Sequence, residues 1–71
     1  MDTVRIGSAV RLRYGELEEA WRIVDSAEAD AAGGRISAET PLARALLGRR
    51  AGDEVTVHSA KPYAVTILHV G

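Results

Sequence analysis

The sequence contains no cysteine and no phenylalanine, and aromatic residues make up only 4% of its 71 positions. Without cysteine it can form neither a disulfide bridge nor a thiolate metal site, and this composition fits a reducing cytoplasm. No apolar run approaches the roughly 20 residues that a membrane helix needs. The first residues also lack the basic and then apolar order of a signal peptide. The sequence therefore predicts a cytoplasmic protein that makes no membrane contact.

The chain also lacks a strong net charge. Lysine and arginine contribute 9 charges and aspartate and glutamate 10, which gives −1 at pH 7. That balance argues against a general electrostatic binder of nucleic acid. With 46% hydrophobic and 27% charged residues, the composition is that of a globular rather than a disordered protein. At 71 residues the chain forms at most one domain, residues 1–71.

The first third of the chain predicts an antiparallel hairpin. Residues 4–14 alternate between an apolar and a basic face, which is typical of a half-buried strand, here bent or bulged at Gly7. A turn at Gly15 leads to a second strand over residues 20–26. The face of the first strand that is expected to point inward consists of Val4, Ile6, Ser8, Val10, Leu12 and Tyr14.

The pattern of residues 27–37 is weaker. Several alanines favour a helical turn, but Gly33 and Gly34 interrupt it, so residues 27–34 are interpreted as a loop that contains such a turn. Residues 35–37 predict a short extended piece.

Residues 41–47 predict a short helix of about two turns. Thr40 is a suitable N-cap, Pro41 occupies the first helical position, and Gly48 is a natural stop. So short a helix does not persist alone, so its apolar face must pack on the sheet. That face consists of Leu42, Ala45 and Leu46, and the two leucines are expected in the core.

The last third predicts two further strands. Residues 54–59 follow a Gly-Asp turn and point Val55 and Val57 inward, and Lys61-Pro62 ends that strand. Residues 63–70 predict the final strand. Both of its faces are rather apolar, so it is expected to lie inside the sheet rather than at an edge. One face consists of Val65 and Ile67, and the other consists of Ala64, Thr66, Leu68 and Val70. The order strand, strand, helix, strand, strand predicts an α+β fold.

His58 and His69 are the first candidates for chemistry. They fall on the last two predicted strands and, if those strands pair as a hairpin, could lie near one another. A two-histidine metal site would lack a clear third ligand, so both are interpreted as structural or surface residues.

The other candidates also favour structure over catalysis. Glu28 and Asp30 lie in an acidic stretch whose spacing matches no calcium loop, so a solvated loop is favoured over a metal site. Gly33-Gly34 lacks the lysine and hydroxyl that follow in a phosphate-binding loop. Trp21 is interpreted as a core or half-core aromatic rather than a binding hot spot. The serines are not predicted to be nucleophiles, because their spacing implies neither a nucleophile elbow nor a neighbouring base. They are Ser8, Ser26, Ser37 and Ser59.

The charges are distributed unevenly along the chain. Acidic residues gather in its middle, while arginines dominate the remainder, a segregation that suits docking on a charged protein surface or is ordinary surface charge. Arg44, Arg49 and Arg50 are interpreted as a solvated flank near the helix C-terminus, where they suit the helix dipole, with steering of a partner as a second role.

Four segments resemble, in order and spacing, the C-terminal domain of the bacterial GreA/GreB transcript cleavage factors. They are IGSAVRL, WRIVDSAEAD, GRISAETPLARALLGRRAGDEVTV and VTILHV, and the resemblance runs from about Val4 to Val70. It implies an FKBP-like fold, a curved antiparallel sheet of about four to five strands with one short helix. It also implies docking on RNA polymerase, at the rim helices beside the secondary channel.

The sequence departs from this family in one important place. In the family, a separate N-terminal helical hairpin carries acidic residues that hold a metal ion at the polymerase active site and stimulate RNA cleavage. Residues 1–15 hold only a strand here, so the resemblance does not carry the cleavage activity. A complete protein of this kind would resemble a competitor or regulator, like the related regulator-of-nucleoside-diphosphate-kinase group. An excised domain would have its other half elsewhere.

The resemblance also supplies the candidate polymerase contacts. The family's acidic residue and proline on either side of a hydroxyl residue correspond to Glu39 and Pro41, with Thr40 where serine is usual. Arg44, on the helix that follows, completes the candidate set. Lys61-Pro62-Tyr63 replaces the family's usual Pro-Gly-Gly-like turn, and Tyr63 adds an aromatic side chain there.

Three functions remain open on the sequence alone. The first is an RNA polymerase-binding module, a monomer without cofactor, metal or enzymatic activity. The second is a prolyl isomerase of the FKBP type, against which the low aromatic content counts, because those active sites are lined by several aromatics. The third is a general protein-interaction domain of a larger protein, since fold does not fix function.

Overall fold

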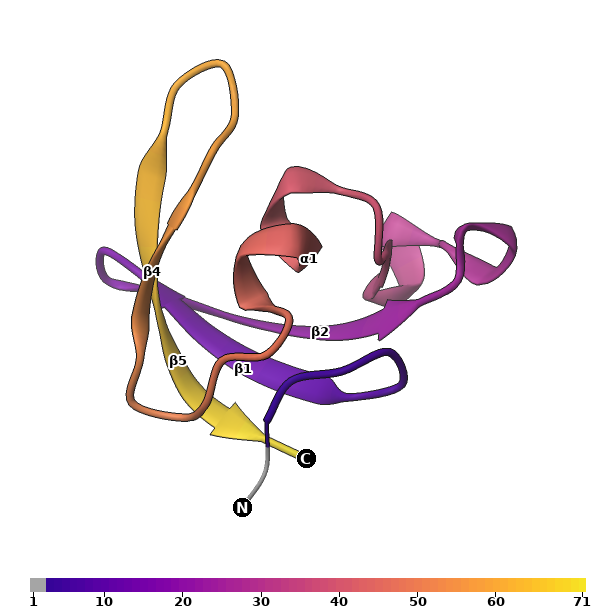
Figure 1. Cartoon of the computed structure of the whole chain (residues 1–71), viewed down its shortest axis with the longest axis horizontal. Coiled ribbons are helices and arrows are strands. Elements are labelled where there is room, and N and C mark those ends of the chain that lie inside the picture. The colour runs from indigo at the N-terminus through magenta and orange to yellow at the C-terminus, as the bar shows by residue number, and fades with distance from the viewer. Residues whose placement is uncertain (1–2) are drawn as a thin grey trace.

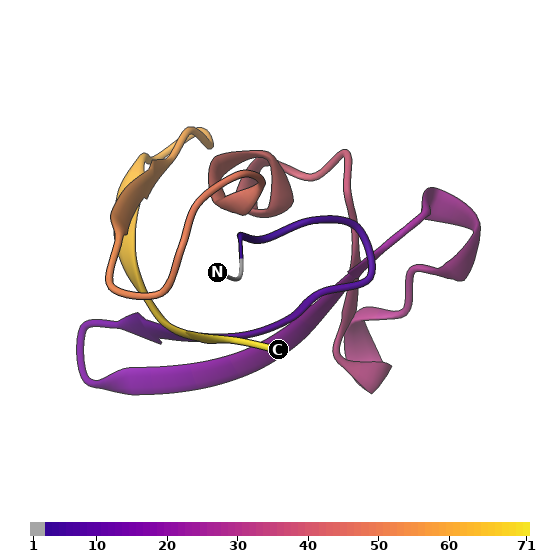
Figure 2. The ribbon, with the colours of Figure 1, turned by 60° about the horizontal axis from the view of Figure 1, so that its bottom comes forward.

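The computed structural model describes residues 3–71 and shows a five-stranded sheet that curls around one short helix (Figures 1 and 2). The strands lie in the order β3-β2-β1-β5-β4. The expected α+β architecture is therefore confirmed. The elements are β1 (Ala9–Tyr14), β2 (Leu17–Val24), the 3-10 helices η1 (Ser26–Glu28) and η2 (Ala31–Gly33), β3 (Arg35–Ser37), α1 (Pro41–Leu46), β4 (Glu54–Val57) and β5 (Tyr63–Val70).

The predicted hairpin is formed by β1 and β2, with a tighter turn and a longer second strand than expected. Tyr14 pairs directly with Leu17, so only Gly15 and Glu16 form the loop. Gly15 has φ +60° in the first loop position, where two-residue hairpin turns favour glycine. The second strand consequently begins at Leu17 rather than at residue 20.

The prediction of a strand from Val4 was wrong for its first five residues, because β1 begins only at Ala9. A turn intervenes, in which Gly7 has φ +97° and donates its amide to the carbonyl of Ile23 at 2.7 Å. This turn breaks the alternation, so Ile6, expected inside, is 54% exposed. Val4 is nevertheless buried, and its amide donates to Arg49 O at 2.8 Å, which ties it to the segment after α1.

The extended piece at residues 35–37 joins the sheet as β3, but in the parallel direction. Arg22, Ile23 and Val24 pair with Arg35, Ile36 and Ser37. The sheet is therefore mixed rather than wholly antiparallel. The segment between β2 and β3, with η1 and η2, supplies the crossover that a parallel neighbour requires.

A bulge in β5 changes which of its side chains reach the core. Leu12 pairs with Ile67 while Arg11 pairs with His69, so Leu68 has no partner on β1. This extra residue shifts the alternation. Val70, expected on the face of Leu68, is therefore buried with Ile67 instead. The predicted interior position of β5 is confirmed, since it lies between β1 and β4.

The helix packs on the inner face of the curl (Figure 2). Leu46 is fully buried, as predicted, but Ala43 shares the deepest position, while Leu42 and Ala45 are half-buried against the core. The small Ala43 side chain lets the backbone of α1 approach the sheet. The largest fully buried side chains are Leu12, Ile23, Leu46, Ile67, Val4 and Val57.

The last two strands form the predicted hairpin. Val55 and Val57 point into the core, and residues 58–62, which include Lys61-Pro62, separate β4 from β5. Tyr63 meets the ring of Tyr14 edge to face, with 5.0 Å between ring centroids. The aromatic contact of Tyr63 is thus made within the fold. In residues 3–71 no helix is long and apolar enough to cross a membrane.

Candidate functional site

The loop before α1 holds Thr40 in a capping geometry. Its backbone is extended, with φ −71° and ψ 154°, and its hydroxyl accepts a hydrogen bond from Ala43 N at 3.2 Å. The same hydroxyl donates to the carbonyl of Ser37 at 2.9 Å, and the Thr40 amide donates to that carbonyl at 3.0 Å. The predicted cap is confirmed, and it fixes Pro41 at the first helical position.

Glu39 is exposed but closely held by two serines. Its amide donates to Ser37 Oγ at 3.1 Å, and its carboxylate oxygen Oε2 accepts from Ser26 Oγ at 3.2 Å. The two serine hydroxyls lie 2.9 Å apart. A hydroxyl has a single hydrogen, and that of Ser26 goes to Glu39, so Ser37 must be the donor between the serines. The bonds therefore close a ring that starts at the Glu39 amide and ends at its carboxylate.

This serine ring, formed by Ser26, Ser37 and Glu39, orients a charge at the surface. Exposed hydrogen bonds stabilise a fold only modestly, because water competes for the same groups. Their effect here is to restrict the side chain of Glu39 beside Pro41. The sequence offers both serines only as candidate nucleophiles, and no local pattern in it predicts that they support Glu39.

Arg44 lies one turn beyond Pro41 on α1. Both are exposed, and with Ala45 and His58 they line a hollow of about 240 Å³. The Arg44 guanidinium is in neither of the two ion pairs found in residues 3–71, which are Arg11–Glu18 and Arg35–Asp30. Pro41 and Arg44 therefore share this hollow with His58, whereas Glu39 and Thr40 do not line it.

The β4–β5 hairpin forms, but it does not bring His58 and His69 together, a proximity that the sequence had left open. Val57, just before His58, pairs with the first residue of β5, whereas His69 pairs with Arg11 near the other end of that strand. Six residues of strand separate the two positions, which is about 20 Å at 3.3 Å per residue. Within residues 3–71 no group of three or more histidine, aspartate or glutamate side chains is placed to hold a metal ion.

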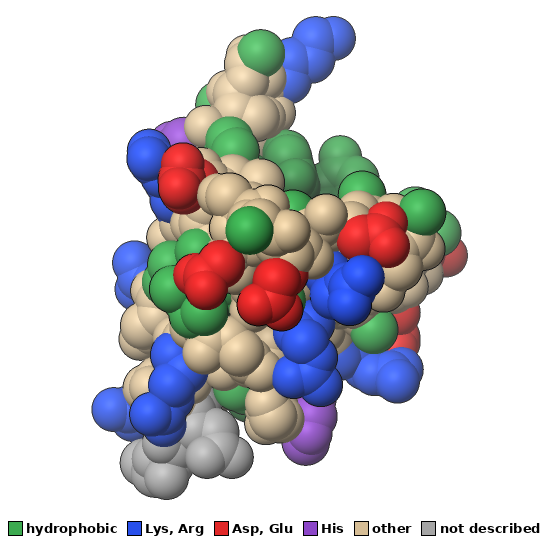
Figure 3. Space-filling view, turned by 90° about the vertical axis from the view of Figure 1, so that its right-hand side faces the viewer, with side chains coloured by type: hydrophobic (Ala, Val, Ile, Leu, Met, Phe, Trp, Pro, Cys, Tyr) green, Lys and Arg blue, Asp and Glu red, His purple; other side chains and the backbone are tan. Residues whose placement is uncertain are grey.

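The acidic stretch has a structural role at Asp30. Its carboxylate accepts hydrogen bonds from Gly33 N and from the guanidinium of Arg35, both at 3.3 Å. It thereby caps η2 and ties the stretch to β3. Figure 3, which views the side of the molecule that carries η1 and η2, shows acidic side chains with lysine or arginine beside them. The charge segregation along the sequence therefore does not produce a face of one sign here.

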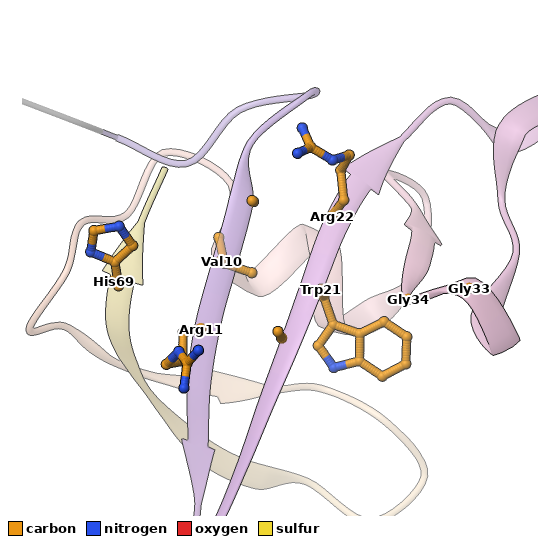
Figure 4. Close-up of a pocket in the computed structure, with 9 residues that line it drawn as sticks. Val10, Arg11, Trp21, Arg22, Gly33, Gly34 and His69 are labelled. Carbon is orange, nitrogen blue, oxygen red and sulfur yellow. The ribbon is translucent and has the colours of Figure 1, made fainter.

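A second hollow, of about 320 Å³, lies on the sheet face turned away from α1 (Figure 4). Alanines and glycines leave this space open, and Trp21 reaches toward Gly33 and Gly34 at its border. Its cations already have partners, because Arg22 donates to the carbonyl of Gly7 at 2.7 Å and Arg11 lies 3.5 Å from Glu18. The hollow contains no carboxylate pair or hydroxyl that would suit catalysis. Its residues are Ala9, Val10, Arg11, Ala20, Trp21, Arg22, Gly33, Gly34 and His69.

The whole sequence, residues 1–71, matches the family model described as "Transcription elongation factor, GreA/GreB, C-term". The chain belongs to the GreA/GreB family. The resemblance carried by the sequence motifs is thereby confirmed, and the region matched is the family's C-terminal domain.

Curated relatives agree with this assignment. The transcription elongation factor GreA of Chloroflexus aurantiacus is 55% identical over 70 residues, which cover 94% of this chain and 45% of that protein. GreA of Geobacillus kaustophilus is 52% identical over 61 residues, covering 82% of this chain and 38% of that protein. The chain thus spans less than half the length of these curated relatives.

Solved structures have the same fold. A GreA/GreB elongation factor from Nitrosomonas europaea superposes with a TM-score of 0.76 at 31% identity, covering 94% of this chain and 58% of that one. GreA factor homolog 1 (Gfh1) of Thermus thermophilus gives a TM-score of 0.84 at 24% identity, covering 99% of this chain and 49% of that one. The Gfh1 likeness concerns the fold alone.

Proposed function

We propose that this domain binds RNA polymerase through Glu39, Thr40, Pro41 and Arg44. The expected place is the rim helices beside the secondary channel, as the family resemblance implies. The single observation that carries the proposal is the serine ring, which holds an exposed carboxylate at a fixed orientation beside an exposed proline. A surface residue that needs no ordering on binding loses less entropy when it meets a partner.

Two further features support this assignment. The chain is a domain of a transcription elongation factor family, and elongation factors act on the transcribing polymerase. Pro41 is rigid and Thr40 is bonded on both sides, so the docking residues stand on a helix end rather than on a long loop. Binding sites placed on rigid elements are held more exactly than sites on loops.

We further propose that residues 3–71 alone bind without cutting RNA. In the family, the acidic tip that stimulates cleavage stands on a helical hairpin, and the described residues form only the sheet, two 3-10 helices and α1. Added to a stalled complex, this domain should therefore compete with a full-length cleavage factor instead of replacing it.

A direct binding assay tests the proposal. We expect saturable binding of the purified chain to core RNA polymerase of Chloroflexus aurantiacus, whose GreA is 55% identical, and competition with that GreA. Glu39→Lys and Pro41→Ala should each weaken binding by about fivefold or more, because we place both among the few interface residues that carry most of the binding energy. Glu16→Lys makes the same charge change in the β1–β2 turn and should bind normally.

Two results would count against this site. If both variants bind like the unmodified chain, Glu39 and Pro41 are not the contacts. If RNA in a stalled complex is shortened when the purified chain is added, the domain has a cleavage activity that the proposal denies.

Prolyl isomerase activity finds no support in the arrangement of the aromatic side chains. Trp21 borders the hollow of Figure 4, whereas Tyr14 and Tyr63 pack on one another beside a different depression. The three do not line one apolar cup, as an isomerase site of that type requires.

A further inference from the structure

The strand β4 forms one edge of the sheet, and its outer side is open. Hydrogen-bonded and non-bonded pairs alternate along an antiparallel ladder. The Ile67 amide donates to Asp53 O at 2.8 Å, so the bonded positions that follow are Val55 and Val57. The amide and carbonyl groups of Glu54 and Thr56 consequently point away from β5. In residues 3–71, neither residue takes part in a backbone hydrogen bond to a loop or helix.

This open edge borders a groove of about 490 Å³. One wall comes from α1 and the segment after it, and the other comes from β4 and the residue that follows it. Figure 2 shows α1 beside the β4 end of the curled sheet. The residues that line the groove are Arg44, Ala45, Leu47, Arg49, Glu54, Val55, Thr56 and His58.

The charge of the groove is unbalanced. Arg44 and Arg49 stand against the single carboxylate of Glu54, and both are exposed. Neither arginine takes part in the ion pairs of residues 3–71, which are Arg11–Glu18 and Arg35–Asp30. His58, also exposed, adds a further cation when protonated. An occupant of this groove therefore gains most if it is acidic.

We propose that the open edge of β4 and this groove bind an extended acidic peptide segment of a partner protein, which adds to the sheet as a further strand. The amides and carbonyls of Glu54 and Thr56 supply the main-chain bonds that give such complexes their affinity. Arg44 and Arg49 select for carboxylates and guide the approach. The small Ala45 side chain leaves room for alternate side chains of the added strand.

The cations also disfavour the other obvious occupant, a second copy of this chain. Pairing two β4 edges would bring the arginines of both copies to one seam, where like charges repel. The groove shares Arg44 with the proposed polymerase contacts but does not include Glu39. A peptide can therefore bind the β4 edge whether or not Glu39 touches a polymerase.

The test uses a blocked heptapeptide of sequence Thr-Glu-Val-Glu-Val-Glu-Thr and a control in which lysine replaces each glutamate. Titrated into isotope-labelled protein, the acidic peptide should shift the amide resonances of Glu54 and Thr56 most and slow their hydrogen exchange. The lysine peptide should bind at least about tenfold more weakly, since several exposed charge contacts reverse their sign.

Variants separate the charge contacts from the main-chain hydrogen bonds. Arg44→Glu combined with Arg49→Glu should weaken binding of the acidic peptide by about tenfold, which corresponds to 1.4 kcal/mol. Thr56→Pro removes the outward amide and should abolish binding, while Thr56→Val keeps it and should bind normally. Circular dichroism shows whether Thr56→Pro folds. If it does not fold, binding of the acidic peptide to the Arg44→Glu, Arg49→Glu double variant tests the proposal instead.

Three results would overturn the inference. The first is equal binding of the acidic and lysine peptides. The second is a shift map centred away from β4, for example on Trp21. The third is a dimer in sedimentation that folded Thr56→Pro dissolves, because the edge would then be covered by a second copy.

Discussion

Ser26 donates a hydrogen bond to the carboxylate of Glu39 across 3.2 Å, although the two residues are 13 positions apart. The contact depends on the parallel pairing of β3 with β2, in which Val24 lies opposite Ser37. That register brings the residues just after each strand together, Ser26 on one side and Glu39 on the other. The crossover between β2 and β3 thus builds the support of the proposed docking residue.

Removing the Ser26 hydroxyl should weaken polymerase binding without weakening the fold. Ser26→Ala frees the Glu39 carboxylate, and ordering a free side chain on binding costs about 0.5–1.5 kcal/mol, so we expect a loss of roughly two- to tenfold in affinity. The free energy of unfolding should change by less than about 0.5 kcal/mol, as is usual at the surface. Biolayer interferometry and urea denaturation measure the two quantities.

Ser59→Ala is the matched control for this change. Ser59 is also exposed and its hydroxyl also donates one hydrogen bond, to Lys61 O at 2.9 Å, but it lies in the β4–β5 loop and supports no carboxylate. A loss of affinity equal to that of Ser26→Ala would show that the serine ring has no special part in binding.

The cap at Thr40 should be measurable as stability. Thr40→Ala removes the bond from Ala43 N and the bond to Ser37 O, and we expect it to lower the free energy of unfolding by about 1–2 kcal/mol. Thr40→Ser keeps the hydroxyl and should lose less than about 0.5 kcal/mol. Urea unfolding followed by circular dichroism compares them, and equal losses would mean that the methyl group rather than the cap matters.

Two leucines of the same helix should differ in their contribution to the core. Leu46 is fully buried, so Leu46→Ala should cost about 2–5 kcal/mol in free energy of unfolding. Leu42 is only half-buried, and Leu42→Ala should cost roughly half as much because less apolar area is lost. Thermal unfolding of both variants gives the order, and a larger loss for Leu42→Ala would contradict the packing described for α1.

The features that the sequence predicted well are those whose causes lie within a few residues. Thr40 and Pro41 begin α1 through contacts at most four residues away, and Gly48 ends it through its own left-handed backbone, with φ +82°. Val55 and Val57 alternate in a regular strand and point inward as expected. Such local rules need no knowledge of what the segment packs against.

The features that the sequence did not predict depend on pairing between distant segments. The three residues of β3 are too few to show a pattern, so neither their parallel direction nor the support of Glu39 by Ser26 could be foreseen. The bulge at Leu68 is invisible in the sequence of β5 alone, since it arises from the register with β1. Ile6 was predicted to point inward because apolar and polar residues alternate in the sequence from Val4 to Tyr14, but the backbone turn at Gly7 interrupts the strand there.

Gly48 provides a test of backbone strain without side-chain contact. It has φ +82°, just after α1, and a Cβ atom placed there would meet nothing within 4 Å. Gly48→Ala should therefore lower the free energy of unfolding by about 1 kcal/mol through the left-handed backbone alone. Gly48→Asn should lose less, because asparagine tolerates this region. The Gly48 amide, which donates to Val4 O at 2.8 Å, is present in both variants, so equal losses in urea unfolding would indicate a cause other than backbone conformation.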